Sequence, residues 1–198
     1  MTKEKLRVKN ITVNFEEKSI IEDVTITLNE GEIVSILGVS GVGKTTLFNV
    51  IAGLINPCIG TVELDGENII GKSGKISYML QKDLLFPFKT ILDNVSLPLI
   101  LKGENKKKAR EIAGKYFSQF GLEGMENKYP KELSGGMRQR AAFLRTYMFS
   151  SEIALLDEPF SALDTITKQK IHTWYLDVVK KLNISILFIT YDIDEAIL

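Results

Sequence analysis

A glycine-rich segment near residue 40 carries the residue types that bind phosphate. Residues 38 to 45 read Gly-Val-Ser-Gly-Val-Gly-Lys-Thr and fit G-x-x-x-x-G-K-[ST] at every fixed position. Glycines let backbone N–H groups curl around phosphate oxygens, Lys44 can reach the β- and γ-phosphates, and the Thr45 hydroxyl can bind Mg²⁺. The pattern predicts that a nucleotide is bound by Gly38, Ser40, Gly41, Val42, Gly43, Lys44, Thr45 and Thr46.

The loop alone is compatible with several classes of phosphate-binding protein. ATPases, GTPases and small-molecule kinases all use such a loop. Guanine specificity is disfavoured because the sequence contains no N-K-x-D segment. The context favours a phosphate loop, because an apolar strand is predicted before it and a helix after it, with the positive end of the helix dipole directed at the same anion.

A pair of adjacent carboxylates follows a second apolar segment. Residues 153 to 156 are predicted to form a strand, and Asp157 and Glu158 come directly after it. At the strand end, Asp157 would face the phosphate loop and hold Mg²⁺. Glu158 is placed to polarise the attacking water, and a general base contributes roughly 100- to 10,000-fold to a rate. The alternative is a strand followed by an ordinary charged loop.

A second potential anion site lies at residues 134 to 136. Ser134 is predicted to cap the N-terminus of a helix, and Gly135 and Gly136 leave backbone amides exposed at the helix start. One chain that binds one nucleotide needs only one phosphate cradle. Two cradles therefore suggest that two chains share nucleotides head to tail.

Strands that alternate with helices must position these residues. Alternating apolar residues predict half-buried antiparallel strands over 6–15 and 20–28, and short apolar runs predict strands over 33–37, 76–80, 153–156 and 186–189. Asp65-Gly66 predicts a hairpin turn. Periodic apolar residues predict helices over 45–54, 106–120, 134–149 and 166–182, whereas residues 83–101, with Pro87 and Pro98, are predicted to be partly irregular.

This order of elements predicts an α/β fold. We expect a P-loop NTPase core with a mainly parallel sheet, an N-terminal antiparallel β subdomain, and a helical subdomain over about residues 89–145. The chain has 198 residues, which suits one domain with subdomains.

Composition narrows the possible partners. Lys plus Arg and Asp plus Glu number 25 each, so the formal net charge is zero and nucleic-acid binding is not expected. The single cysteine, Cys58, excludes a disulfide within the chain and fits a reducing compartment. No apolar run approaches the roughly 20 residues that span a bilayer, so a membrane process would need its membrane part from another chain.

Together these motifs resemble the ATP-binding subunit of ABC transporters, and the resemblance covers nearly the whole chain. Residues 133 to 139 match the signature motif, and residues 161 to 164 match the D-loop, which contacts the partner subunit. The resemblance implies that Gln81 touches Mg²⁺ and the attacking water. It also implies that Phe15 stacks on adenine, although the residue taken alone could equally belong to the core.

The resemblance also implies partners. Two subunits would form a homodimer that holds two ATP molecules, each between one phosphate loop and the signature of the other subunit. Opening and closing of this dimer would drive a membrane permease, which would bind at residues 82 to 92. The alternative for this segment is an apolar loop packed on its own core. The group resembled is that of bacterial nitrate, sulfonate, taurine and pyrimidine-precursor importers, which implies a solute-binding protein and a cytoplasmic location on the inner face of the membrane.

Two features depart from the family pattern. The family's switch histidine is expected just after the strand over 186–189, where this chain has Tyr191. A tyrosine hydroxyl can donate one hydrogen bond, but the ring carries no positive charge at neutral pH. We therefore expect ATP binding to persist and hydrolysis to be slow. The sequence also stops soon after this position, at Leu198, whereas the family usually continues with more strands and a helix. Either the sequence is shortened or the protein is naturally short.

Three functions fit these observations. The first is an active transporter ATPase, with Glu158, Gln81 and Tyr191 at the reacting phosphate and Thr45, Gln81 and Asp157 at Mg²⁺. The second is a nucleotide-binding regulatory or structural subunit with little turnover, which Tyr191 would favour. The third, an ABC ATPase of DNA repair or translation, is disfavoured because the sequence has neither a long coiled coil nor a second such domain.

Overall fold

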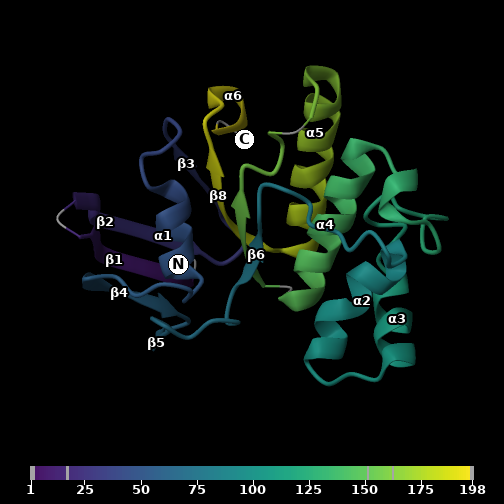
Figure 1. Ribbon diagram of the computed structural model, residues 1–198, viewed down its shortest axis with the longest axis horizontal. Helices are drawn as coiled ribbons and strands as arrows, with labels where there is room; N and C mark the ends of the chain where they lie inside the picture. Colours follow the sequence, from purple (N-terminus) through teal and green to yellow (C-terminus); the bar gives the residue numbers. More distant parts are fainter. Residues whose placement is uncertain (1–2, 17, 151, 162, 197–198) are drawn as a thin grey trace. The chain divides into compact units, whose positions relative to one another are not determined.

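The computed structural model describes residues 3–16, 18–150, 152–161 and 163–196, with the backbone alone at residues 165 and 166. The chain forms two compact units, each built from segments that are distant in the sequence (Figure 1). The first unit comprises Met1–Tyr78, Glu152–Glu158 and Asn183–Leu198, and the second comprises Met79–Ser151 and Pro159–Leu182.

An antiparallel sheet makes up one part of the first unit. Its strand order is β2-β1-β4-β5, from β1 (Glu4–Phe15), β2 (Lys18–Asn29), β4 (Ile59–Leu64) and β5 (Glu67–Asn68). The turn between β4 and β5 has positive φ at both Asp65 and Gly66, 50° and 81°, as a tight hairpin turn requires. The predicted N-terminal antiparallel region and its hairpin turn are confirmed.

A second sheet, whose paired core strands are parallel, completes the first unit. Its order is β3-β8-β7-β6, from β3 (Ile33–Leu37), β8 (Ser185–Thr190), β7 (Ile153–Asp157) and β6 (Ser77–Met79), of which Met79 belongs to the second unit. β7 and β8 are buried along their whole length, as predicted for a parallel sheet. β3 was expected to be buried but is only half-buried. Among the described strands it lies at the edge of this sheet, with β8 as its neighbour.

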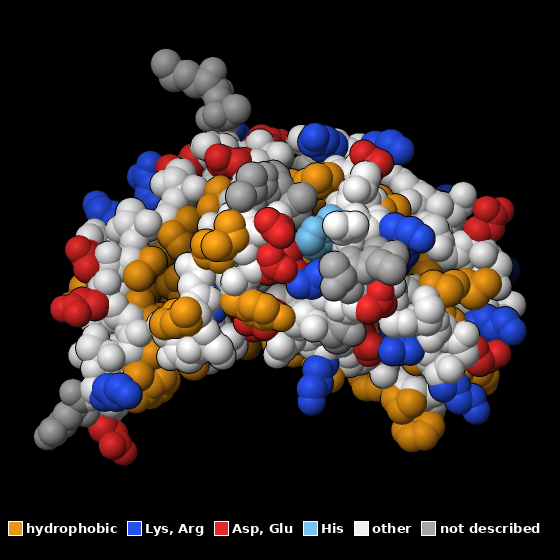
Figure 2. Space-filling model, turned by 90° about the horizontal axis from the view of Figure 1, so that it is seen from above, with side chains coloured by type: hydrophobic (Ala, Val, Ile, Leu, Met, Phe, Trp, Pro, Cys, Tyr) orange, Lys and Arg blue, Asp and Glu red, His pale blue; other side chains and the backbone are white. Residues whose placement is uncertain are grey.

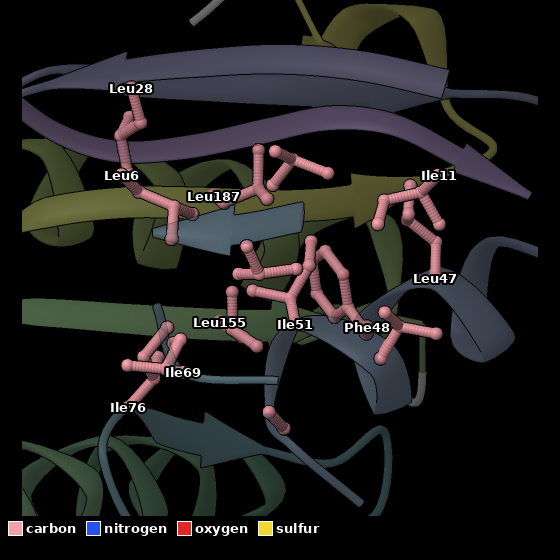
Figure 3. Close-up of a cluster of buried hydrophobic side chains, with 14 of the residues drawn as sticks. Leu6, Ile11, Leu28, Leu47, Phe48, Ile51, Ile69, Ile76, Leu155 and Leu187 are labelled. Atoms are coloured by element: carbon pink, nitrogen blue, oxygen red, sulfur yellow. The ribbon is translucent and has the colours of Figure 1, made fainter. Parts of the chain in front are cut away.

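The core of the first unit lies where helix α1 (Lys44–Ile51) meets the two sheets (Figure 3). Phe48 and Ile51 of α1 are fully buried with apolar side chains of both sheets, among them Leu6, Ile11, Leu155 and Leu187. This packing fixes α1 against the strands that precede the predicted phosphate loop and the paired carboxylates. A short helix, α6 (Ile193–Ala196), follows β8.

Helices make up most of the second unit. They are α2 (Ile91–Leu101), α3 (Lys106–Gly114), α4 (Gly135–Phe149) and α5 (Thr165–Leu182), with a 3₁₀ turn at Pro130–Glu132. α2 packs against both α3 and α4, and the Phe143 and Tyr175 rings stack at 4.2 Å between α4 and α5. The predicted α/β fold with a separate helical region is confirmed.

Two helices of the second unit differ from prediction. Residues 91–101 form a helix rather than an irregular segment: Thr90 caps it by accepting from the Asp93 amide at 3.2 Å, and Pro98 is accommodated near its C-terminal end. α3 ends at Gly114, earlier than the apolar stripe indicated. The stripe is nevertheless buried through Ala109, Ala113, Phe117 and Phe120.

Charges of both signs are interspersed on the face shown in Figure 2, in keeping with a formal net charge of zero. Within the residues that the structure describes, no helix is both long and apolar enough to cross a membrane.

Candidate functional site

The predicted phosphate loop joins β3 to α1 in the first unit. Gly41 and Gly43 adopt φ values of 83° and 95°, in the left-handed region that favours glycine. A Cβ atom at Gly43 would lie 2.8 Å from the carbonyl oxygen of Ile20, so this position has no room for a side chain. The loop is therefore shaped by backbone geometry that only glycine provides.

Lys44 lies over the start of this loop. Its Nζ donates hydrogen bonds to the carbonyl oxygens of Gly38 and Val39, at 2.6 Å and 2.9 Å. A lysine tied to the loop in this way holds its positive charge close to the loop backbone. The arrangement favours a phosphate, which attracts both the ammonium group and the N-terminus of α1.

The hydroxyl of Thr45 connects the loop to the carboxylate at the end of β7. Thr45 Oγ1 donates to Asp157 Oδ2 at 3.1 Å, and the Tyr78 hydroxyl donates to the same oxygen at 3.3 Å. Burial raises the pKa of Asp157, against the lowering effect of these hydrogen bonds and of Lys44. A buried carboxylate of this kind favours a cation beside it.

Glu158 follows Asp157 in an unusual backbone conformation. Its φ is 45°, in the left-handed region, and its N–H donates to the Ile189 carbonyl at 3.0 Å. Burial and then the neighbouring Asp157 charge raise the pKa of Glu158, whereas Lys44 opposes the shift. A raised carboxylate pKa brings a group closer to the range of a general base.

A cavity of about 200 Å³ lies above the loop within the first unit. Two side chains from other segments reach it: Ile20, near the start of β2, and Glu158, which directly follows β7. The rest of its lining comes from the predicted nucleotide-binding residues Ser40, Gly41, Gly43, Lys44, Thr45 and Thr46. The structure thus brings most of the predicted loop residues and Glu158 to one cavity, although Gly38 and Val42 do not line it.

Tyr191 comes directly after β8, beside the start of the phosphate loop. Leu37 pairs with Thr190, and the Gly38 N–H donates to the Thr190 carbonyl at 3.4 Å. The turn after the strand is held by Thr190, whose hydroxyl donates to the buried Glu195 carboxylate at 2.5 Å and accepts from the Asp192 amide at 3.0 Å. Tyr191 itself is 51% exposed.

Phe15 ends β1 with its side chain 54% exposed, so it does not lie in the core. Ile20, in the partner strand of the same hairpin, lines the cavity and was not singled out from the sequence. The predicted antiparallel strands over 6–15 and 20–28 contained a signal for it, because a strand that pairs with the one carrying Phe15 brings its own side chains to the same end of the sheet. Tyr78 and Glu195 were also missed.

The second unit carries the predicted signature. Ser134 caps α4, its side chain accepting a hydrogen bond from the Met137 amide at 3.3 Å. A Cβ atom at Gly135 would meet Leu163 at an ordinary 3.5 Å, whereas at Gly136 it would lie 2.8 Å from Ile171. Gln81 donates to the Ser161 hydroxyl at 3.3 Å, and Ala162 of the predicted D-loop lies outside the described residues.

The segment over residues 82 to 92 is tied to the helices of its own unit. From α4, Arg145 donates to the carbonyl oxygens of Asp83 and Leu84, and Arg138 donates to the Asp83 carboxylate at 3.2 Å. Three apolar side chains of the segment point outward all the same: Leu84, Phe86 and Phe88 are 52%, 46% and 90% exposed. The segment is therefore not an apolar loop packed entirely on its own core.

The chemistry of the first unit fits a magnesium–nucleotide complex. Backbone amides, Lys44 and the cavity suit phosphates. The described residues contain no cluster of three or more His, Cys, Asp or Glu side chains able to cage a metal. One hydroxyl and one carboxylate, Thr45 and Asp157, instead suit Mg²⁺, which is bound through few protein ligands together with substrate phosphates.

Known proteins resemble this chain along its length. The family described as ABC transporter matches residues 21–161. The formylaminopyrimidine import ATP-binding protein ThiZ of Halalkalibacterium halodurans is 47% identical over 199 residues, covering 100% of this chain and 78% of the relative. The taurine import ATP-binding protein TauB of Escherichia coli O157:H7 is 38% identical over 192 residues, covering 97% of this chain and 75% of the relative.

Solved structures agree with these relatives. The dimeric bacterial ABC transporter cassette MJ0796 superposes with a TM-score of 0.80 at 32% identity, covering 96% of this chain and 90% of that one. The ADP conformation of MJ1267, an ATP-binding cassette of an ABC transporter, gives 0.85 at 26% identity, covering 98% and 84%. On its sequence, its fold and the phosphate loop that its first unit builds, the chain belongs to the ABC transporter family.

Proposed function

We propose that this chain is the ATP-binding subunit of an ABC importer, and that it couples ATP binding and hydrolysis to solute transport by a separate membrane permease. The observation that carries the proposal is the hydrogen bond from Thr45 to Asp157, which joins the phosphate loop to the second carboxylate motif. Glu158 lines the same cavity as the loop. Relatives that carry the name of import ATP-binding proteins support the importer assignment.

The proposed roles within the first unit combine its geometry with what the family resemblance implies. The loop amides and Lys44 hold the phosphates, Phe15 stacks on adenine, and Thr45 with Asp157 holds Mg²⁺. When bound, Mg²⁺ neutralises charge that develops on the transferred phosphoryl group. Glu158 accepts a proton from the attacking water, and its raised pKa suits that role. Tyr191 donates a hydrogen bond toward the terminal phosphate.

We infer that the working state is a homodimer with two ATP molecules. Ser134, Gly135 and Gly136 of the partner's signature would complete each site. The capped start of α4, with no acidic side chain in its first turn, supports an anion-binding role for this helix. Similarity to a dimeric cassette also supports it. We further propose that residues 1–198 form one nucleotide-binding domain with a helical subdomain over about residues 89–145.

The outward apolar side chains of residues 82 to 92 support a protein contact there. We propose that the permease binds at this segment, which places the subunit in the cytoplasm on the inner face of the membrane. A separate solute-binding protein would deliver the solute. The names of the relatives, formylaminopyrimidine and taurine importers, suggest a small organic solute.

Steady-state hydrolysis tests the proposed reaction and the effect of Tyr191. We expect the wild type to bind ATP and hydrolyse it slowly. Tyr191→His should hydrolyse ATP at least about tenfold faster than the wild type, because an imidazole can donate a hydrogen bond and can also carry a positive charge. Tyr191→Phe is the matched control, since it removes only the hydroxyl and should be slower than the wild type. ATP affinity should change less than about threefold across the series.

The outcomes separate the functions. If Tyr191→His is no faster than the wild type, the role given to Tyr191 is wrong. If no variant turns over ATP even with the permease present, the regulatory function replaces the ATPase. Co-purification with the membrane permease encoded beside its gene would support the importer, and its absence would contradict that assignment.

A further inference from the structure

Tyr78 occupies the second position of β6 and contacts both elements that carry the proposed Mg²⁺ ligands. Its hydroxyl donates to Asp157 Oδ2 at 3.3 Å, at the end of β7. Its ring meets the Phe48 ring of α1 edge-on, with centroids 5.9 Å apart and planes at 79°. Phe48 lies three residues after Thr45 on the same helix, so both residues face the same side of α1.

The two carboxylate oxygens of Asp157 differ in how many hydrogen bonds they accept from side chains. Thr45 and Tyr78 both donate to Oδ2, and among the described residues no side chain donates to Oδ1. Asp157 is only 6% exposed, so solvent contributes little to the orientation of its side chain. Two fixed donors on one oxygen set the rotation of the carboxylate and direct the other oxygen away from them.

We propose that Tyr78 is a positioning residue of the Mg²⁺ site, and that its hydroxyl orients Asp157 so that the free oxygen is presented to the ion. The inference rests on the proposed function, because it takes Thr45 and Asp157 as the ligands. When Mg²⁺ takes the Thr45 hydroxyl as a ligand, the donor to Oδ2 that remains independent of the metal is Tyr78. Partners in the outer shell of a metal site typically change metal affinity 10- to 100-fold when removed.

The ring fixes where that hydroxyl lies. The edge-on contact with Phe48 ties Tyr78 to the helix that begins with Lys44 and Thr45. Phe48 is fully buried, so this ring contact lies in the core and not at the surface. A tyrosine hydroxyl is a donor at neutral pH and can hold an ionised carboxylate. Tyr78 therefore links the orientation of Asp157 to the position of the phosphate-loop helix.

Tyr78→Phe removes the hydroxyl and keeps the ring, which makes it the informative variant. Mn²⁺ can be used as the probe, with the nucleotide analogue AMP-PNP present, and its binding followed by electron paramagnetic resonance. We expect about tenfold weaker Mn²⁺ binding. AMP-PNP affinity measured in EDTA should stay within about twofold of the wild type, because the loop and Lys44 are unchanged.

Tyr175→Phe is the matched control. It also removes a buried tyrosine hydroxyl, one that contacts the Met79 sulfur at 3.4 Å in the second unit. This variant should bind Mn²⁺ as the wild type does. Urea unfolding of both variants separates a general loss of stability from a change at the metal site, because only Tyr78→Phe should combine near-normal stability with weak Mn²⁺ binding.

Two results would overturn different statements. Mn²⁺ affinity of Tyr78→Phe within twofold of the wild type would refute the positioning role and leave the proposed function intact. A wild type whose AMP-PNP binding does not respond to Mn²⁺ at all would refute the proposed magnesium–nucleotide site itself.

Discussion

Two helices of this chain begin at predicted anion sites, and their N-termini are built differently. α1 begins after Gly43, in a left-handed conformation at φ 95°, and no side chain caps it. α4 begins after Ser134 in an extended conformation, and the Ser134 hydroxyl accepts from the Met137 amide. Neither helix has an acidic side chain in its first turn.

The difference shows two ways to prepare a helix start for a phosphate. At α1 the first amides are left for the ligand, and the loop before them has a shape that glycines impose. At α4 one amide is already satisfied by the cap, so the helix start is stable before any ligand arrives. We therefore expect changes at the first site to affect nucleotide binding, and changes at the second to affect stability and association.

The largest effect is expected at Gly43. Gly43→Ala must keep a positive φ and place its Cβ 2.8 Å from the Ile20 carbonyl oxygen, a backbone atom that cannot move aside easily. We expect ATP affinity to fall about 100-fold, which corresponds to about 2.8 kcal/mol. Isothermal titration calorimetry would measure this change.

Gly66→Ala is the control for Gly43→Ala. Gly66 has φ 81° but no atom within 4 Å of an added Cβ. It should lose about 1 kcal/mol of stability from backbone strain and keep normal ATP affinity. If Gly43→Ala bound ATP within threefold of the wild type, the glycine-imposed shape would not be what the first site requires.

A smaller effect is expected where α4 packs on α5. A Cβ atom at Gly136 would lie 2.8 Å from Ile171 and 3.2 Å from Thr167, both on α5. Gly136→Ala should lower the free energy of unfolding by about 1–2 kcal/mol through overpacking. Gly135→Ala meets only an ordinary contact and should cost little. Urea denaturation would compare them, and equal midpoints would contradict the packing role given to Gly136.

A smaller loss of stability than at Gly136 is expected at Ser134. Ser134→Ala should lose about 1 kcal/mol because the cap is gone, whereas Ser134→Asp should stay as stable as the wild type, since aspartate caps equally well. The added charge should nevertheless repel a nucleotide phosphate. ATP-dependent dimerisation should therefore weaken in the aspartate variant. Light scattering would measure dimerisation, with both proteins also carrying Glu158→Gln. Unchanged dimerisation would argue against phosphate binding at α4.

Local patterns predicted the parts of the site that depend on local geometry. The phosphate-loop spacing, the two carboxylates at the end of β7 and the Ser134 cap each follow from residues close in sequence, and the structure has all of these features. The hairpin turn at Asp65 and Gly66 was predictable for the same reason.

Features that depend on distant contacts were not predictable in this way. Pro98 suggested a break, but packing of α2 against α3 and α4 keeps the helix intact. Tyr78 meets Asp157 across 79 positions of sequence, and no pattern around Tyr78 indicates that pairing. The half-buried state of β3 depends on its place in the strand order, which a short apolar run does not reveal.

The left-handed backbone of Glu158 has a consequence for the whole fold. A residue with a Cβ atom held at such a φ typically loses about 1–3 kcal/mol relative to an unstrained one, and folded domains are stable by only about 5–15 kcal/mol. Glycine or asparagine would sit there with less strain but could not serve as the base. The proposed catalytic carboxylate is thus a position where thermal stability has been exchanged for activity, and a more heat-resistant chain could be obtained there only by giving up turnover.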